Sequence, residues 1–259
     1  MGVLNVTPDS FSDGGRYLDP ALAEKRALKM QDEGAHILDI GGESSRPGSK
    51  PVPAREEIRR ILPVLKRLSK KLKIPVSVDT CKYDVAMAAL DQGAVIVNDI
   101  TALSGDRRMA KLIVRYKASV VLMHMRGEPG TMQKDPEYRS VLKEVKAYLK
   151  KASEMALEAG VDGARIAVDP GFGFGKTAEH NLELLAHLES LRSLKLPVLV
   201  GLSRKSFIGQ LLDAPVTERL TGSLAAAAVA IQRGANILRV HDVKAHRELA
   251  ALVDRTQGS

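Results

Sequence analysis

Short runs of β-branched and other apolar residues alternate with longer amphipathic segments along the whole chain. This alternation is typical of repeated strand–helix units built around a parallel sheet. It predicts eight strands, at residues 3–6, 36–40, 75–79, 95–99, 119–124, 165–169, 197–202 and 236–240. Eight units in 259 residues match the size of one closed barrel. We therefore predict a single α/β domain, residues 1–259, folded as a (β/α)8 TIM barrel.

Capping residues mark several of the predicted helix ends. Asp19 precedes Pro20, a pairing that favours the start of a helix. Glycine stands between a helix and the next strand at Gly34, Gly93 and Gly234. Because glycine readily adopts the left-handed conformation that ends a helix, these positions support the repeated strand–helix organisation.

Polar side chains stand at the carboxyl end of every predicted strand. They are Asn5, Asp39, Asp79, Asn98 with Asp99, His124, Asp169, Ser203 to Lys205, and Arg239 with His241. In a barrel these strand ends converge on one mouth, which is where active sites of this fold lie. The pattern therefore predicts an active site at the mouth.

The chemistry of these strand-end residues divides into two groups. Carboxylate and amide groups suit a flat heterocycle with several N–H donors, whereas cationic groups suit anionic oxygens. Asp79, Asn98 and Asp169 belong to the first group, and Lys205, Arg239 and His241 to the second. The implied ligand is a polar heteroaromatic ring joined to phosphate. For Asp39 and Asp99, bonding to neighbouring backbone is at least as good an interpretation as ligand contact, and Arg204 is equally well interpreted as a partner in a structural ion pair.

The glycine-rich stretch from Asp169 to Thr177 ends in Gly-Lys-Thr but does not match a Walker phosphate loop, because Pro170 occupies the position of the first glycine. Its glycines are spaced two apart, which also excludes the Rossmann pattern. We expect a backbone that lets a ligand approach closely, and we expect Lys176 on the surface. The histidines His36, His180, His187 and His246 are expected away from the mouth.

Composition narrows the class of partner and the compartment. The chain has 39 Lys and Arg against 31 Asp and Glu, a net charge of +8, which suits either nucleic acid or a small anionic substrate. Aromatic residues make up only 3% and tryptophan is absent, which argues against nucleic acid. With one cysteine, Cys81, no membrane-length apolar run and no visible signal peptide, we expect a cytoplasmic protein that binds no membrane.

Four segments resemble the signature motifs of dihydropteroate synthases. They are residues 5–15, 39–48, 169–176 and 203–206, and the resemblance extends over essentially the whole chain. It implies a barrel enzyme of folate synthesis that joins 6-hydroxymethyl-7,8-dihydropterin diphosphate to 4-aminobenzoate and releases diphosphate. It also implies a dissociative mechanism, Mg²⁺ as the metal, sulfonamides as competitors of aminobenzoate, and a homodimer.

The resemblance assigns roles to individual residues. It places the pterin ring against Asp79, Asn98, Asp169 and Lys205 with Met123 on its face, the diphosphate at Arg239 and His241, and Mg²⁺ at Asn5. It places aminobenzoate at Phe174, Lys205 and Ser206, with Phe11, Asp13, Ser45, Arg46 and Pro47 completing the site. The catalytic groups that it implies are Asp13, Arg46, Lys205, Arg239 and His241.

Two other functions remain open on the sequence alone. One is a methyltransferase that moves a methyl group from methyltetrahydrofolate to a corrinoid protein, since that relative shares the barrel and the Asp-Asn-Asp pterin contacts. The other is a catalytically silent barrel that binds pterin. The pairing of residues 203–206 with Arg239 and His241 favours the synthase, because the methyltransferase binds no diphosphate.

Overall fold

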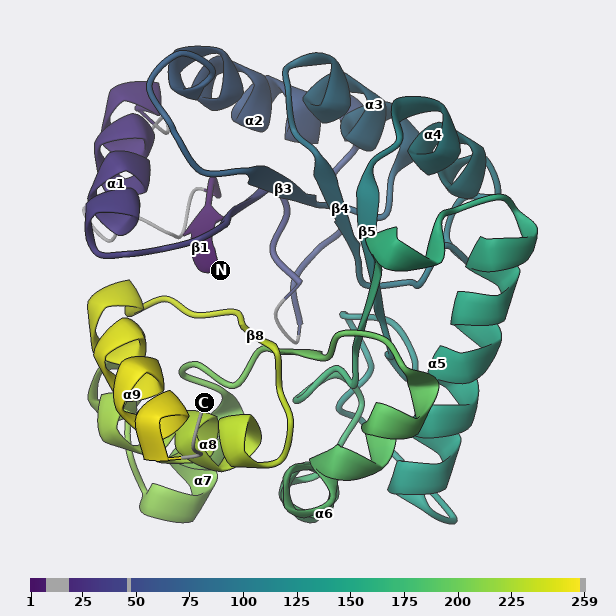
Figure 1. The fold of residues 1–259 in the computed structure, drawn as a ribbon, viewed down its shortest axis with the longest axis vertical. Helices are drawn as coiled ribbons and strands as arrows, with labels where there is room; N and C mark the ends of the chain where they lie inside the picture. Colours follow the sequence, from purple (N-terminus) through teal and green to yellow (C-terminus); the bar gives the residue numbers. More distant parts are fainter. Residues whose placement is uncertain (8–18, 46–47, 257–259) are drawn as a thin grey trace.

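The structure, a computed structural model, describes residues 1–7, 19–45 and 48–256. In this part of the chain, parallel strands lie at the centre and helices surround them (Figure 1). The strands are β1 (Gly2–Asn5), β2 (Leu38–Gly41), β3 (Val76–Asp79), β4 (Ile96–Asp99), β5 (Ser119–Met123), β6 (Ile166–Asp169), β7 (Leu199–Val200) and β8 (Ile237–Leu238). The α-helices are α1 (Pro20–Asp32), α2 (Ala54–Leu68), α3 (Tyr83–Asp91), α4 (Met109–Tyr116), α5 (Val141–Glu158), α6 (Ala178–Ala186), α7 (Ser206–Leu212), α8 (Leu220–Gln232) and α9 (Val243–Thr256). Short 3-10 helices lie at Gly163–Arg165, Leu188–Leu194 and Val216–Glu218.

The strands close into a ring. Strands β1 to β6 pair in chain order, each parallel to the next, and β7 pairs with β8. Single bridges join the two sheets, Val168 with Val198 on one side and Gly2 with Val240 on the other. The amide of Val3 donates to the carbonyl of Val240 at 2.9 Å across the second junction. The predicted fold class, a (β/α)8 barrel, is confirmed.

The last two strands are shorter than the sequence predicts. Each contains two ladder residues, although the pattern predicts strands over 197–202 and 236–240. At their amino ends, the side-chain oxygen of Asn236 accepts from the amide of Val198 at 2.9 Å. A side chain therefore takes a place that a backbone carbonyl holds in a regular ladder. The other strands differ from the prediction by a residue or two at their ends.

The predicted helix ends are confirmed. Helix α1 begins at Pro20, and the side chain of Asp19 accepts from the amide of Ala21 at 2.8 Å. Gly34, Gly93 and Gly234 have φ angles of +92°, +93° and +98°, the left-handed conformation that stops a helix before the next strand.

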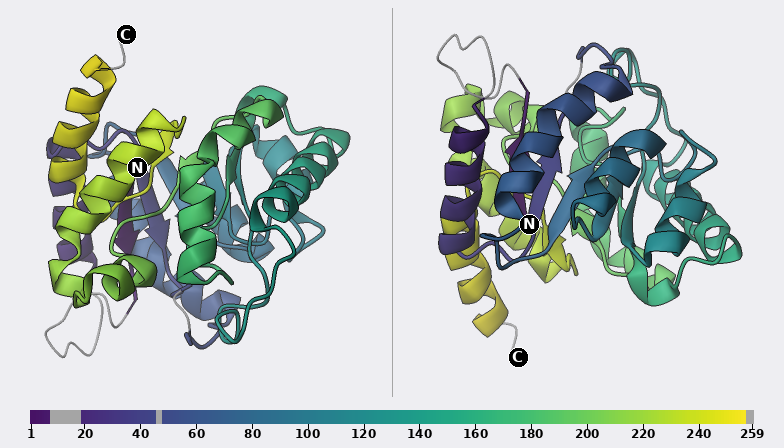
Figure 2. Two further views of the ribbon diagram at one scale, coloured as in Figure 1. Left: turned by 90° about the horizontal axis from the view of Figure 1, so that it is seen from below. Right: turned by 90° about the horizontal axis from the view of Figure 1, so that it is seen from above.

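The apolar core forms two large clusters. One packs β1 to β5 against α1 to α4 and includes the fully buried Ile40, Ile61 and Leu122. The other packs β6 and β7 against α5 to α8 and includes Phe172 and Leu149. Both views in Figure 2 show α9, which follows the last strand, along the outer side of the barrel. Among the helices of the described residues, none is long and apolar enough to cross a membrane.

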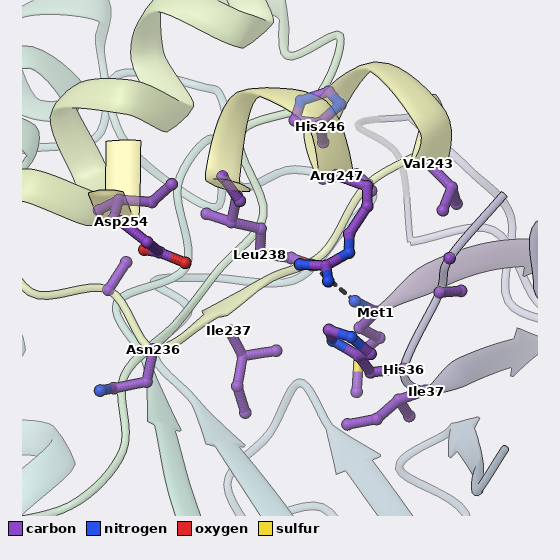
Figure 3. Close-up of a pocket in the computed structure, with 16 residues that line it drawn as sticks. Met1, His36, Ile37, Asn236, Ile237, Leu238, Val243, His246, Arg247 and Asp254 are labelled. Carbon is purple, nitrogen blue, oxygen red and sulfur yellow. Dashed lines mark hydrogen bonds between the residues drawn. The ribbon is translucent and has the colours of Figure 1, made fainter. Parts of the chain in front are cut away.

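A cavity opens where the amino ends of β1, β2 and β8 meet, at the floor of the barrel (Figure 3). The amine of Met1 donates to the carbonyl of Leu238 there at 2.9 Å. His36 and His246 also line this cavity, so both lie away from the mouth as predicted. The remaining lining comes from Gly34, Ala35, Ile37, Ile231, Ala235, Asn236, Ile237, Val240, Val243, Arg247, Ala250 and Asp254. The residues predicted for the active site are not among those that line it.

Candidate active site

A second cavity lies at the opposite end of the barrel, where the carboxyl ends of the strands converge. Its lining includes most of the described residues predicted for the site: Ser45, Asp79, Asn98, Met123, Asp169, Phe174, Lys205 and Arg239. Ile100, Phe172 and Gly201 complete it. These three were missed because apolar residues and a lone glycine carry no signal that separates a cavity wall from the core. The site therefore draws on strands that are distant in sequence.

Strand register brings the polar acceptors together. Asp79 at the end of β3 pairs with Asn98 at the end of β4, and Met123 at the end of β5 pairs with Asp169 at the end of β6. Asn98, Met123 and Asp169 are each 3–4% exposed, so they are largely withdrawn from solvent. Asp169 is held in place by the amide of Gly171, which donates to its Oδ1 at 2.7 Å. Two carboxylates and one amide thus face a single small cavity.

Arg239 links two of these strands through their carboxylates. Its Nε donates to Oδ2 of Asp39 at 2.7 Å, and its Nη2 donates to Oδ2 of Asp79 at 2.6 Å. Asn98 donates to the same oxygen of Asp39 at 3.3 Å. Asp39 is fully buried and does not line the cavity, but its carboxylate bonds two side chains and not the neighbouring backbone that the sequence suggested, because the closed ring brings Arg239 and Asn98 to it. Asp39 therefore orients Arg239 and Asn98 from a buried position outside the cavity lining.

Asp99 and Arg204 are also engaged within the protein. Asp99 accepts from the amides of Thr101 and Leu103 at 2.8 and 2.9 Å. Arg204 makes a two-pronged ion pair with Asp242, at 2.9 and 2.6 Å. The interpretation of both as residues that bond within the protein is confirmed. Neither lines the mouth cavity.

Burial sets the electrostatics of the mouth. It raises the pKa of Asp79 to about 7, although the charge of Arg239 lowers that pKa. It also raises the pKa of Asp169, against the amide of Gly171 and the charge of Lys205. Burial lowers the pKa of Arg239, but Asp39 and Asp79 together raise it above its ordinary value. Carboxyl groups with shifted pKa values that share a cleft with permanently charged cations are typical of a functional site.

The remaining predicted residues lie at the rim. The Nζ of Lys205 lies 4.2 Å from the centre of the Phe174 ring, a cation–π contact, while the neighbouring Ser206 is exposed at the start of α7. His241 places its Nδ1 3.2 Å from the hydroxyl of Ser203. Ser206, His241 and Asn5 do not line the cavity itself.

Part of the prediction lies outside the described residues. Phe11, Asp13, Arg46 and Pro47 belong to the segments 8–18 and 46–47. The described residues contain no group of three His, Cys, Asp or Glu side chains that could hold a metal. At the end of β1, Asn5 Oδ1 lies 3.8 Å from where a Cβ on Gly41 would stand, and Asp79 Oδ2 lies 3.7 Å from the same point. The amide oxygen of Asn5 and the carboxylate oxygen of Asp79 thus lie near the same point, and oxygens of both kinds are ligands that suit Mg²⁺.

The expectation that Lys176 lies on the surface is wrong. The residue is 2% exposed, and its Nζ lies 3.0 Å from Nδ1 of His124. The same Nζ donates to the carbonyls of Gly171 and Phe174 at 2.9 and 3.0 Å. The glycines let the loop fold back over its own last residue, so a side chain that the pattern places outside turns inward.

Comparison with known proteins decides the family. The model of the pterin-binding enzymes matches residues 1–241. The chain belongs to the family of pterin-binding enzymes. Within that family it is 45% identical to the dihydropteroate synthase of Escherichia coli K12 over 256 residues, which is 99% of this chain and 90% of the relative.

Solved structures of pterin-binding enzymes agree with this result. The Yersinia pestis dihydropteroate synthase, in complex with a sulfonamide drug, superposes with a TM-score of 0.95 at 42% identity and covers 100% of this chain and 94% of its own. The Xanthomonas albilineans dihydropteroate synthase with 4-aminobenzoic acid gives a TM-score of 0.93 at 45% identity, with coverage of 100% and 92%. The predicted activity, a transferase that forms dihydropteroate, is confirmed.

Proposed function

We propose that the mouth cavity binds the pterin diphosphate and 4-aminobenzoate side by side and joins them into dihydropteroate. One observation carries the assignment of the site: Asp79, Asn98 and Asp169 face the same cavity as Lys205 and Arg239. A cluster of acceptors beside two cations matches a nitrogen-rich ring that bears an anionic leaving group. The family match and the 4-aminobenzoic acid complex of the Xanthomonas relative support this choice of substrates.

The pterin ring is recognised by the acceptors and covered by an apolar side chain. Asp169 and Asp79 accept from ring N–H groups, Asn98 supplies both an acceptor and a donor, and Lys205 donates to ring acceptors. Met123, which is buried beside Asp169 in the strand register, packs on the face of the ring. Because these groups are largely buried, a ring that leaves one of them unpaired is rejected strongly.

The diphosphate is held by Arg239 and His241, with Asn5 contributing an oxygen ligand to Mg²⁺. A bound Mg²⁺ supplies charge neutralisation for the leaving group. Asp39 and Asp79 already orient Arg239, so its guanidinium binds the anion without a free-energy cost for reorienting the side chain. The C–O bond to the diphosphate breaks first, and the electron-rich dihydropterin ring spreads the positive charge left on its exocyclic carbon.

Aminobenzoate binds on the other side of that carbon, against Phe174, Lys205 and Ser206. Phe11, Asp13, Ser45, Arg46 and Pro47 complete this part of the site and exclude water, which otherwise captures the cation. The carboxylate of Asp13 stabilises the cation, Arg46 stabilises the transition state, and the amine of aminobenzoate attacks. The new C–N bond replaces the broken C–O bond, and the amine proton leaves with the products.

Further properties follow from the same proposal. The whole chain, 1–259, acts as one barrel domain, cytoplasmic and homodimeric, with small molecules rather than nucleic acid or membrane as partners. Sulfonamides compete with aminobenzoate, as the drug complex of the Yersinia relative suggests.

The decisive experiment measures dihydropteroate formation from the two substrates, with Mg²⁺ and with excess chelator. We expect product only in the presence of Mg²⁺. A folded protein that binds the pterin but forms no product would favour the silent barrel. Methyl transfer from methyltetrahydrofolate to a corrinoid protein, assayed in parallel, would identify the methyltransferase.

A further inference from the structure

The loop between β6 and α6, residues 170–177, carries Phe174 into the mouth, and side chains form hydrogen bonds with many of its backbone groups. Asn181 accepts from the amide of Gly173 at 2.7 Å, and Tyr138 donates to the carbonyl of Gly175 at 2.8 Å. The side-chain amide of Gln133 donates to the carbonyl of Gly173. The shape of this loop is therefore imposed by its surroundings.

The loop also packs closely against the residues that follow β5. Gly171 and Gly175 have φ angles of +68° and +63°, and a Cβ on either would overlap a carbonyl oxygen, of His124 or of Arg126 respectively. These two glycines permit the close approach but do not hold it, because glycine adds no attraction and leaves the backbone free. Something else must keep the loop in contact with β5.

Lys176 occupies the place where such a contact is needed. Its three short contacts, to His124 Nδ1, Gly171 O and Phe174 O, match the three N–H donors of an ammonium group. Burial and the charges of Lys176 and Arg126 lower the pKa of His124 to about 2, so its ring is neutral and can accept. One side chain thus ties the end of β5 to both turns of the loop.

We propose that Lys176 is a positioning residue for the second substrate: by holding the carbonyls of Gly171 and Phe174 beside His124, it sets where the Phe174 ring stands. Lys176 itself does not line the cavity, so it acts through Phe174. The inference rests on the proposed function, in which Phe174 and Lys205 form the aminobenzoate site.

The pterin side of the cavity depends less on Lys176. Asp169 is fixed by the strand, since its carbonyl accepts from the amide of His124 at 2.9 Å. Its carboxylate is influenced more by Lys205 and Arg239 than by Lys176. Burial lowers the pKa of Lys176 to about 7. The charge of Asp169 raises this pKa, whereas the charges of Lys205 and Arg126 lower it. Burying the charged form of Lys176 therefore costs free energy that an apolar side chain would not cost.

The test compares steady-state kinetics of Lys176→Met, Phe174→Ala and the wild-type enzyme. Met keeps the length of the side chain and removes its donors. We expect Lys176→Met to raise the KM for 4-aminobenzoate about tenfold and to change the KM for the pterin diphosphate less than about threefold, because small displacements of a positioning group cost this much. Lys150→Met is the matched control, since this lysine is exposed on α5, and it should change neither constant.

Each outcome separates the inference from the function on which it rests. Wild-type enzyme without turnover would overturn the proposed function. If Phe174→Ala leaves the KM for aminobenzoate unchanged, the proposed subsite is wrong and the inference falls with it. If Phe174→Ala raises that KM and folded Lys176→Met does not, or if Lys176→Met raises both KM values equally, the positioning role is wrong.

A second variant keeps the test open if Lys176→Met does not fold. Tyr138→Phe removes the hydroxyl that fixes the carbonyl of Gly175 and preserves the ring, so it tests the same loop with little risk to the fold. We expect a selective rise of two- to fivefold in the KM for aminobenzoate, by the same argument from small displacements. An unchanged KM would overturn the proposal that anchoring of this loop sets the second site.

Discussion

The turns at the two ends of the barrel are built in different ways. At the floor, Gly34, Gly93 and Gly234 each end a helix with a φ near +90° and lead directly into a strand. At the mouth, the loop 170–177 keeps its shape through side chains from other parts of the chain, among them Tyr138 and Asn181. A floor turn thus needs only its own few residues, whereas the mouth loop needs the assembled barrel.

The charged groups follow the same division. At the mouth Arg239 joins Asp39 of β2 to Asp79 of β3, and Lys205 lies over Phe174, so charges are coupled across several strands. At the floor the amine of Met1 donates to a backbone carbonyl, that of Leu238. The comparison indicates that changes at the mouth alter activity and changes at the floor alter stability, as is typical of this fold.

The largest effect is expected at Asp169. Asp169→Asn removes a buried charge from the predicted pterin contact, and we expect binding of the pterin diphosphate to weaken more than about a hundredfold, measured by calorimetric titration. Asp162→Asn is the matched control, because Asp162 also accepts from an amide two residues ahead, at 3.0 Å, but far from the mouth. Equal affinities of the two variants would remove Asp169 from the site.

Asp39→Asn should show that the mouth also contains structural charges. The change breaks a buried pair with Arg239, and we expect the free energy of unfolding in urea to fall by about 3 kcal/mol. Asp106→Asn breaks an exposed Arg–Asp pair and should cost less than about 1 kcal/mol. Similar losses of unfolding free energy in both variants would show that burial does not increase the contribution of the ion pair to stability.

The raised pKa of Asp79 makes stability depend on pH. The folded value of about 7 lies above the unfolded value of 3.8, so the stability that this carboxyl contributes is complete below pH 3.8 and is lost as pH rises through 7. The Asp79→Asn variant has no carboxyl group at this position, so it does not lose stability in this way as the pH rises. Relative to wild type, the variant should therefore gain about 2 kcal/mol of unfolding free energy between pH 5 and pH 8. A constant difference across this range would contradict the raised pKa.

The smallest effect is expected at a floor turn. Gly93 has a φ of +93°, and a Cβ added there would meet nothing within 4 Å, so Gly93→Ala introduces backbone strain alone. We expect a loss of about 1 kcal/mol in thermal or urea unfolding, with kcat and both KM values unchanged. A changed KM in the Gly93→Ala variant would show that a floor turn affects activity as well as stability.

Much of the barrel could be predicted because its signals are local. Eight apolar runs, the cap at Asp19 and the glycines at Gly34, Gly93 and Gly234 each depend on a few neighbouring residues. The late start of β7 and β8 could not be predicted, since a side-chain bond between Asn236 and Val198, which are 38 residues apart, lies at their amino ends. Lys176 was misplaced for the same reason, because its partner His124 is 52 residues away.

The sequence by itself determined the strand–helix repeat, the family and the set of polar residues at the strand ends, because periodicity and motif are properties of short segments. Only the tertiary structure decided which of those polar residues face the cavity and which bond to one another. Asp79 is the last residue of β3 and lines the cavity, whereas Asp39 lies two residues before the end of β2 and is fully buried beside Arg239. That distinction depends on depth in the closed ring: Asp39 is in register with Ser77, two residues before Asp79, so it points to the same face but lies further from the mouth.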